Sequence, residues 1–355
     1  MPAFDAQAET NHSVTQQSNP QWRGVADLYH ALFTGLILTL VSRRGTADAA
    51  EFVFRVFRRQ QQERFVAGLA KLGLDHLPPA VAAAQYHYLS NWIGGVHVEY
   101  IYETDRKAWI RYPPPRWIWR GTAICGVPSE VSKAMLRGWH ANNGVALGNL
   151  KLGFVCTKQS VDGQDGLEGY YYEADEPLEL DQRLQFARHL EAPLFDPAAA
   201  PALPVESWPK PRLEKAHRNY AMEYVRTAAP VLVQLFGPLD GGYLLHLTGK
   251  LIGMQSYDDL ARALGITGRD AAGFAALLRA LLDAQGDEVE LRDSGGSFEL
   301  RQTGWGLIDG VADAHPACLR VLEGLAEGLA AGCGRRIVVS LAGDHRTMPL
   351  LWTVR

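Results

Sequence analysis

Apolar residues recur at helical spacing through the first part of the chain, which predicts a run of helices ahead of any strand. They repeat every three or four residues along positions 21–44 and again along positions 49–72. This period places them on one face of a helix. Gly45 and Gly73 follow the two stretches, where a glycine commonly ends a helix. A third helix is expected over residues 80–92.

The apolar period then changes to two, which is typical of strands. Residues 97–102 and 108–112 alternate around a polar turn, so they are expected to form a hairpin. A helix is expected from Pro128 through His140. Strands over 150–158 and 167–173 follow, joined by a turn rich in Asp and Gly.

The same order of elements starts again in the second half of the chain. Residues 45–74 align with residues 237–266 without a gap, and Gly73 then matches Gly265. We interpret this match as an internal duplication. It predicts an α+β fold made of two tandem pseudo-repeated units related by a pseudo-twofold axis. Each unit would hold an antiparallel sheet covered on one face by helices.

Composition along the chain sets the expected boundaries. Residues 1–20 are polar and aperiodic, as in a disordered arm. Residues 176–212 are rich in Pro and Ala, as in a linker. The first α+β half is therefore expected over 21–175 and the second over 213–355.

Residues 256–302 resemble a winged helix-turn-helix in their order of helix, tight turn, helix and hairpin. The second helix of that segment, DAAGFAALLRALLDA, has almost no side chain that reads bases or neutralises phosphates. We therefore expect a winged-helix-like structural unit in the second half and no nucleic-acid partner.

Overall composition excludes several classes of protein. The formal net charge of −4 lacks the basic excess of a general nucleic-acid binder. Four scattered cysteines form no CxxC pair, so neither a disulfide framework nor a structural zinc site is expected. The longest apolar run, residues 31–41, is too short to span a bilayer. Phosphate-loop, dinucleotide, GxSxG and HExxH motifs are absent from the sequence. We expect a cytoplasmic protein without a cofactor, a metal or a membrane partner, and we consider a homodimer.

The stretch 136–175 concentrates chemically reactive side chains. His140 is a candidate general base, and Asn142 and Asn143 interrupt a helical pattern that they do not favour. Cys156 lies in an apolar strand, as a buried residue or as a nucleophile. Alternation places it on the same face as Lys158, whose charge would favour the thiolate.

Carboxylates and aromatic residues add to this stretch. Asp162 belongs to the turn, and Glu168 shares a strand face with Tyr170. Each carboxylate is either a turn or edge residue or a group that orients water. The preceding segment is dense in aromatic residues, and core packing is the first explanation for them. Together with the basic residues of that segment, they could also line a pocket for a small anionic or planar ligand. The aromatic residues are Tyr100, Tyr102, Trp109, Tyr112, Trp117 and Trp119, and the basic ones are Arg106, Lys107, Arg111, Arg116 and Arg120.

The helix–hairpin pattern resembles the L-2-amino-thiazoline-4-carboxylic acid hydrolase family. The resemblance rests on Cys125 at the helix entry, W-H-x-x-N-G at 139–144, LGNLKLGFVCTK at 147–158 and GLEGYYYE at 166–173. It covers roughly residues 97–173. It implies a hydrolase that opens a C–N bond in a small cyclic amidine-like substrate.

These observations lead to one hypothesis with two alternatives. A small-molecule hydrolase would hold its substrate between the aromatic hairpin, the helix of His140 and the second hairpin. The expected catalytic residues are His140 as base, Cys156 as nucleophile, and Glu168 and Asp162 as groups that orient water. The expected substrate-binding residues are Trp139, Asn143, Arg111, Trp109 and Tyr170. The alternatives are a non-catalytic ligand-binding or sensor protein, such as a regulator using residues 256–302, and an interaction scaffold.

Overall fold

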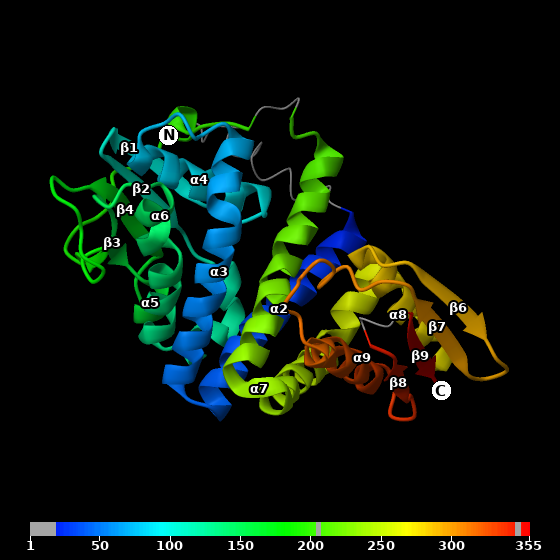
Figure 1. The fold of residues 1–355 in the computed structure, drawn as a ribbon. Coiled ribbons are helices and arrows are strands. Elements are labelled where there is room, and N and C mark those ends of the chain that lie inside the picture. The colour runs from blue at the N-terminus through cyan, green and yellow to red at the C-terminus, as the bar shows by residue number, and fades with distance from the viewer. Residues whose placement is uncertain (1–18, 204–206, 345–348) are drawn as a thin grey trace, which may run out of the picture.

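The computed structural model describes residues 19–203, 207–344 and 349–355, so the expected N-terminal arm lies almost wholly outside the described residues. The fold is α+β, with two separate sheets and a layer of long helices between them (Figure 1). Each sheet belongs to one unit of the chain. The first unit runs from α2 to β5 and the second from α7 to β9.

The first unit opens with three helices, α2 (Pro20–Arg43), α3 (Thr46–Leu72) and α4 (Pro79–Ile93). Its sheet has the order β1-β2-β4-β3-β5. The strands are β1 (Glu99–Thr104), β2 (Lys107–Tyr112), β3 (Leu152–Lys158), β4 (Leu167–Glu173) and β5 (Leu184–Phe186). The helical elements between and after them are η2 (Trp117–Trp119), η3 (Gly121–Gly126), α5 (Ser129–Gly138), η4 (His140–Asn142), α6 (Asn143–Ala146), η5 (Ser160–Asp162) and η6 (Pro197–Ala199).

The second unit opens with α7 (Lys210–Leu264), whose two helical halves meet at a kink at Gly237. Its sheet has the order β6-β7-β9-β8. The remaining elements are α8 (Ala271–Gln285), β6 (Val289–Asp293), β7 (Phe298–Gln302), η7 (Pro316–Leu319), α9 (Arg320–Cys333), β8 (Val339–Ala342) and β9 (Leu350–Val354).

Several elements of the two units match in order and length. Helices α4 and α8 begin at residues 79 and 271 and end at residues 93 and 285, which is 192 residues apart at both ends. Gly45 and Gly237 share a positive φ, 94° and 79°, at the junction of the first two helices. Without its last strand, the first sheet has the same strand order as the second. Internal duplication remains our interpretation of this match.

Two local expectations differ from the structure. Residues 176–212 were expected to be linker, but β5 lies within them and pairs in parallel with β3. The first sheet is therefore mixed rather than purely antiparallel. The helix predicted to run through His140 ends at Gly138, and His140 begins the short turn η4.

Helices α2 and α7 lie side by side in the centre of the molecule and join the units (Figure 1). Helix α2 is long and apolar enough to cross a membrane by length and composition, and 67% of its apolar window is buried here. Asn19 caps it by accepting a hydrogen bond from the Gln21 backbone N–H at 3.0 Å. It is a core helix of this fold.

Helices α7 and α9 pack backbone against backbone through glycines. A Cβ atom on Gly324 would lie 2.1 Å from the His246 carbonyl oxygen, and one on Gly328 would lie 2.1 Å from the Lys250 carbonyl oxygen. Only glycine allows so close an approach. Gly249 and Gly253 of α7 face the same contact.

The winged-helix-like segment 256–302 is built into the second unit. It starts inside α7, and the β6–β7 hairpin continues into the sheet through β9. Ala272, Arg279 and Asp283 are the exposed residues of α8, and Arg279 pairs with Asp283 at 3.5 Å. Arg279 is therefore the one exposed side chain of this helix suited to reading bases, and it already has an acidic partner.

Candidate functional site

The first sheet separates the predicted site residues onto its two faces. Trp109 pairs with Tyr170 and Arg111 pairs with Glu168, so these four side chains share one face. Cys156 pairs with Gly169 one position along, on the opposite face. His140 and Asn143 contact that second face, which the helices cover. The sheet therefore lies between the two groups, and they do not line one pocket.

A β-bulge moves Lys158 away from Cys156. The register between β3 and β4 shifts between Cys156 and Lys158, so Lys158 pairs with Glu168. Its ammonium lies 3.1 Å from Asp165 and 3.3 Å from Glu191. The expectation that Lys158 shares a face with the thiol was wrong, because strict alternation fails at a bulge.

Cys156 is a buried thiol rather than an activated one. Its Sγ donates to the Lys158 carbonyl oxygen at 3.4 Å. The pKa of Cys156 is raised to about 12, chiefly because the thiol is buried. The thiol is therefore protonated near neutral pH and is a poor nucleophile. Asp162 accepts hydrogen bonds from Arg188 and Gln159.

The side chains on the outer face bind one another. Glu168 is buried and accepts from the Thr157 hydroxyl at 2.7 Å and the Ala192 backbone N–H at 3.1 Å. Arg111 lies 3.6 Å from Glu168 and donates to Glu99 at 2.9 Å. The Trp109 indole donates to Glu103 at 2.6 Å, and its ring lies 4.5 Å from that of Tyr170. Their polar groups are satisfied by neighbours from the same unit.

The inner face carries a buried polar cluster that starts at Gln61 of α3. Gln61 is fully buried and donates to the Asn143 Oδ1 atom at 3.2 Å. Its own Oε1 atom accepts from Asn142 at 2.7 Å. These bonds explain why two asparagines interrupt the helix after α5, because their amides satisfy a buried glutamine.

Asn143 fixes the tautomer of His140 through Tyr171. The Asn143 amide donates to the Tyr171 hydroxyl at 2.9 Å, and that hydroxyl lies 2.6 Å from His140 Nδ1. A hydroxyl has one hydrogen to donate, and among the described residues His140 Nδ1 is the acceptor within reach of the Tyr171 hydrogen. His140 Nδ1 therefore accepts, and Nε2 carries the hydrogen.

His87 of α4 stacks on His140 and extends the cluster. The two imidazole centroids are 4.2 Å apart with the rings inclined by 16°. Burial lowers the pKa of His87 to about 3. The pKa of His140 lies well below its ordinary value, chiefly because of burial and also because His87 and Arg116 are close. Two stacked imidazoles in a dry site are both neutral. The half-buried Trp139 contacts His87 edge-on, with centroids 5.8 Å apart.

Hydrogen bonds of tyrosine side chains extend the cluster to the second unit. His87 Nε2 accepts from the Asn143 amide at 3.4 Å, so its Nδ1 hydrogen is given to the Tyr112 hydroxyl at 3.2 Å. From α7, Tyr220 donates to Asn91 of α4 at 2.9 Å and lies 3.0 Å from the Tyr224 hydroxyl. The cluster therefore spans α3, α4, the first sheet and α7.

Arg116 places a positive charge in this cluster without a counterion. Its side chain is 6% exposed, and its guanidinium lies 4.5 Å from the centre of the Tyr112 ring. Within the part of the chain that the structure describes, its Nη1 atom has no hydrogen-bond partner and no carboxylate pairs with the guanidinium. Burial lowers its pKa. Removing an unpaired cation from water costs several kcal/mol.

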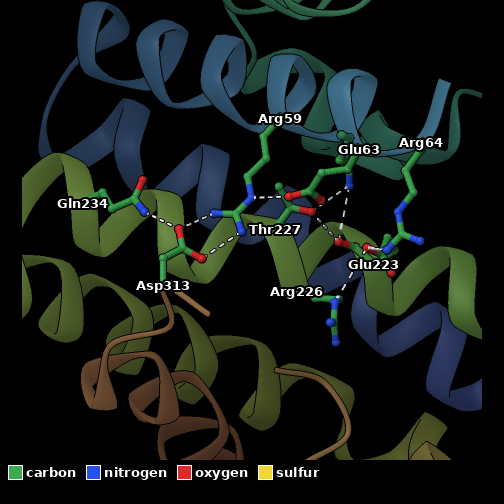
Figure 2. A network of polar contacts seen from close by, with 9 residues as sticks. Arg59, Glu63, Arg64, Glu223, Arg226, Thr227, Gln234 and Asp313 are labelled. Atoms are coloured by element: carbon green, nitrogen blue, oxygen red, sulfur yellow. Dashed lines mark hydrogen bonds and ion pairs between the residues drawn. The ribbon is translucent and has the colours of Figure 1, made fainter. Parts of the chain in front are cut away.

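A separate hollow of about 420 Å³ lies where α3, α7 and residues 310–313 meet. Figure 2 shows the polar side chains at this seam. Arg59 donates twice to Asp313, at 2.7 and 2.9 Å, and Arg64 pairs with Glu223. The arginines here already have acidic partners, so the hollow is the surface of an ion-pair network that joins the units.

The structure thus brings His140, Asn143 and Trp139 together and places Arg111, Trp109, Tyr170 and Glu168 elsewhere. Sequence reasoning named Arg116 only as one of several basic residues. It also overlooked further members of the cluster, because lone polar residues on apolar helices and strands resemble ordinary surface positions. Those members are Gln61, Asn91, Tyr171, Tyr220 and Tyr224.

Comparisons with known proteins give no match. No family model, no curated protein and no solved structure matches this chain. Among the described residues, no group of three His, Cys, Asp or Glu side chains is placed to hold a metal ion. The resemblance to thiazoline-carboxylate hydrolases therefore stays a prediction, and function is argued from the cluster alone.

Proposed function

We propose that this is a cytoplasmic, non-catalytic small-ligand-binding protein whose ligand presents a small anionic group, such as a carboxylate, to Arg116. One observation carries the proposal: a buried guanidinium that has no carboxylate partner in the described chain. An anion against Arg116 would offset the cost of its burial, and Arg is the residue best suited to carboxylates.

The surrounding hydrogen bonds favour an acceptor rather than a donor as the ligand group. Arg116 offers only donors. The Tyr112 hydroxyl accepts from His87 and so keeps its own hydrogen to give. His140 carries its hydrogen on Nε2, because Nδ1 accepts from Tyr171. Arg116, the Tyr112 hydroxyl and His140 Nε2 therefore offer hydrogen-bond donors and few acceptors. A ligand group rich in oxygen lone pairs complements such a set.

The same geometry gives less support to the predicted hydrolase. The lone pair of His140 Nδ1 is already engaged by Tyr171, so the ring is not placed to take a proton from water or a thiol. Burial keeps the Cys156 thiol protonated. Hydrolysis stays a prediction, tested with 2-aminothiazoline-4-carboxylate as substrate. Turnover that disappears in His140→Ala and Cys156→Ala variants would favour hydrolysis over binding alone.

Binding in this cluster would affect both units, as expected of a sensor. Arg116 follows β2 of the first unit, while Tyr220 and Tyr224 belong to α7 of the second unit. A bound anion would therefore strengthen the contact between α4 and α7. A regulator that binds DNA would shift a labelled duplex in a gel at physiological salt, and we expect no shift.

The proposal is tested by thermal unfolding with sodium acetate, formate and chloride as probes, at constant ionic strength. A specific anion raises Tm, by an amount equivalent to about 2.7 kcal/mol at 100 times its Kd. We expect this shift in the wild type and its loss in Arg116→Met. The matched control is Arg106→Met, because Arg106 pairs with Asp175 at the surface. No shift with any probe, or an equal shift in Arg116→Met, would overturn the proposal.

A further inference from the structure

We propose that the exposed face of the second half of α7 is a dimer interface for another copy of this chain. Four large apolar side chains stand on it: Leu239, Tyr243, Leu251 and Met254 are 85%, 61%, 44% and 43% exposed. With the half-buried Leu247 they follow a spacing of four, four, four and three residues, which is one face of a helix. We call these five residues the apolar stripe.

The first unit shows that the fold does not require an apolar face here. Positions 192 residues earlier, on α3, carry Ala47, Glu51, Arg55, Arg59 and Gln62. Arg55 donates to Glu51 at 2.7 Å, and Arg59 donates to Glu63 at 2.8 Å. The equivalent face of α3 is thus charged, and its Arg59 also pairs with Asp313 of the second unit. The apolar stripe therefore occupies positions whose counterparts in the alignment are mostly polar, and packing within the chain does not require it to be apolar.

An antiparallel copy of the same helix fits the stripe in shape and charge. The helix has no internal break between residues 238 and 264, so it offers a straight surface about 40 Å long. In a twofold antiparallel pairing centred near residue 245, Leu239 faces Leu251 of the second copy and Tyr243 faces Leu247. The same register brings Asp240, 66% exposed and 3.7 Å from Arg44, opposite Lys250, 44% exposed and 2.9 Å from Glu327, twice by symmetry. Each of these two charges would then extend an ion pair that already exists within its own chain.

Light scattering after gel filtration, over a wide range of protein concentration, tests the proposal with the full-length chain. We expect the wild type to dimerise with rising concentration. Tyr243→Glu combined with Leu251→Arg installs the residues of α3 and is expected to give a monomer with an unchanged Tm. The control is Val66→Glu, because Val66 is an exposed apolar residue of α3, at 52%, outside the stripe. It should leave the dimer intact.

Charge exchange tests the register. Asp240→Lys alone should weaken dimerisation, and Asp240→Lys with Lys250→Asp should restore it. Both variants should keep the wild-type circular dichroism spectrum. A wild-type monomer at every concentration would overturn the proposal. So would a dimer that survives the Tyr243→Glu and Leu251→Arg changes, or a monomer that floats with phosphatidylcholine vesicles, since the stripe would then bind lipid.

Discussion

Gln61 of α3 and Gly253 of α7 are 192 residues apart, which is the offset at which we align the two units. Gln61 donates to Asn143 at 3.2 Å and holds the buried cluster, whereas a Cβ on Gly253 would lie 2.4 Å from the Leu325 carbonyl oxygen. The second unit thus closes this space with helix backbones, while the first unit keeps it open for polar side chains. This position therefore packs helix backbones in the second unit and holds a buried polar cluster in the first.

Replacing Gln61 should therefore destabilise the protein more than its exposure suggests. Gln61→Leu fills the space but leaves the Asn142 and Asn143 amides without their partner. An unsatisfied buried polar group costs about 1–3 kcal/mol. We expect the free energy of unfolding in urea to fall by this amount. The neighbouring Gln62→Leu, on the exposed face, should change it little, and equal losses in both variants would contradict this account.

Much of the architecture could be predicted from the sequence, because it follows from apolar period and glycine placement. The helix ends at Gly73 and Gly265 and the match between α3 and the second half of α7 are of this kind. β5 could not be predicted in the same way. It is three residues long and is stabilised by pairing with β3 rather than by any pattern of its own.

The site was harder to predict, since it depends on which face of a sheet each side chain occupies. Alternation correctly placed Glu168 and Tyr170 on one face, but it failed at the bulge before Lys158. His140 and Asn143 were chosen for their chemistry, and they do meet. Arg116 is a candidate ligand-binding residue because no carboxylate pairs with it in the described chain, and no sequence pattern reveals this.

Because α7 and α9 pack closely, adding even a methyl group at a contact glycine should lower the stability of the protein considerably. Gly324→Ala would place a methyl group 2.1 Å from the His246 carbonyl oxygen, which belongs to rigid helix backbone. The helices must move apart, and overpacking of this kind typically costs about 1–3 kcal/mol. We expect a lower Tm by differential scanning calorimetry. As the control, Gly304→Ala has open space around it and should melt close to the wild type.

Asp287 predicts a pH dependence of stability in the second unit. Burial is the largest cause that raises its pKa from 3.8 to about 6, although the Gly306 backbone N–H and the Gln302 amide donate to it at 2.7 and 2.9 Å. A raised pKa means that the folded state binds the proton more tightly than the unfolded state. The stability that this proton contributes is full below the unfolded pKa and is lost as the pH rises through about 6.

The measurement compares wild type with Asp287→Asn by urea unfolding from about pH 4 to about pH 8. Taking the difference removes the titration of the other carboxylates. The wild type should lose roughly 3 kcal/mol relative to the variant across this range, at about 1.4 kcal/mol for each unit of pKa shift. A difference that stays constant with pH, or that grows in favour of the wild type as the pH rises, would show that Asp287 titrates normally.

Thiol reactivity separates the two functions considered for the first unit. Cys125 is exposed, whereas Cys156, Cys318 and Cys333 are buried. Burial raises the pKa of Cys156 to about 12, so its thiolate is scarce near neutral pH. We expect a disulfide reagent to modify Cys125 at once in the native protein and to reach Cys156 only on unfolding. Mass spectrometry of the labelled peptides gives the measurement, and Cys125→Ser should remove the fast phase. Rapid labelling of Cys156 in the Cys125→Ser variant would instead reveal an accessible, activated thiol. That result would favour the hydrolase over the binding protein.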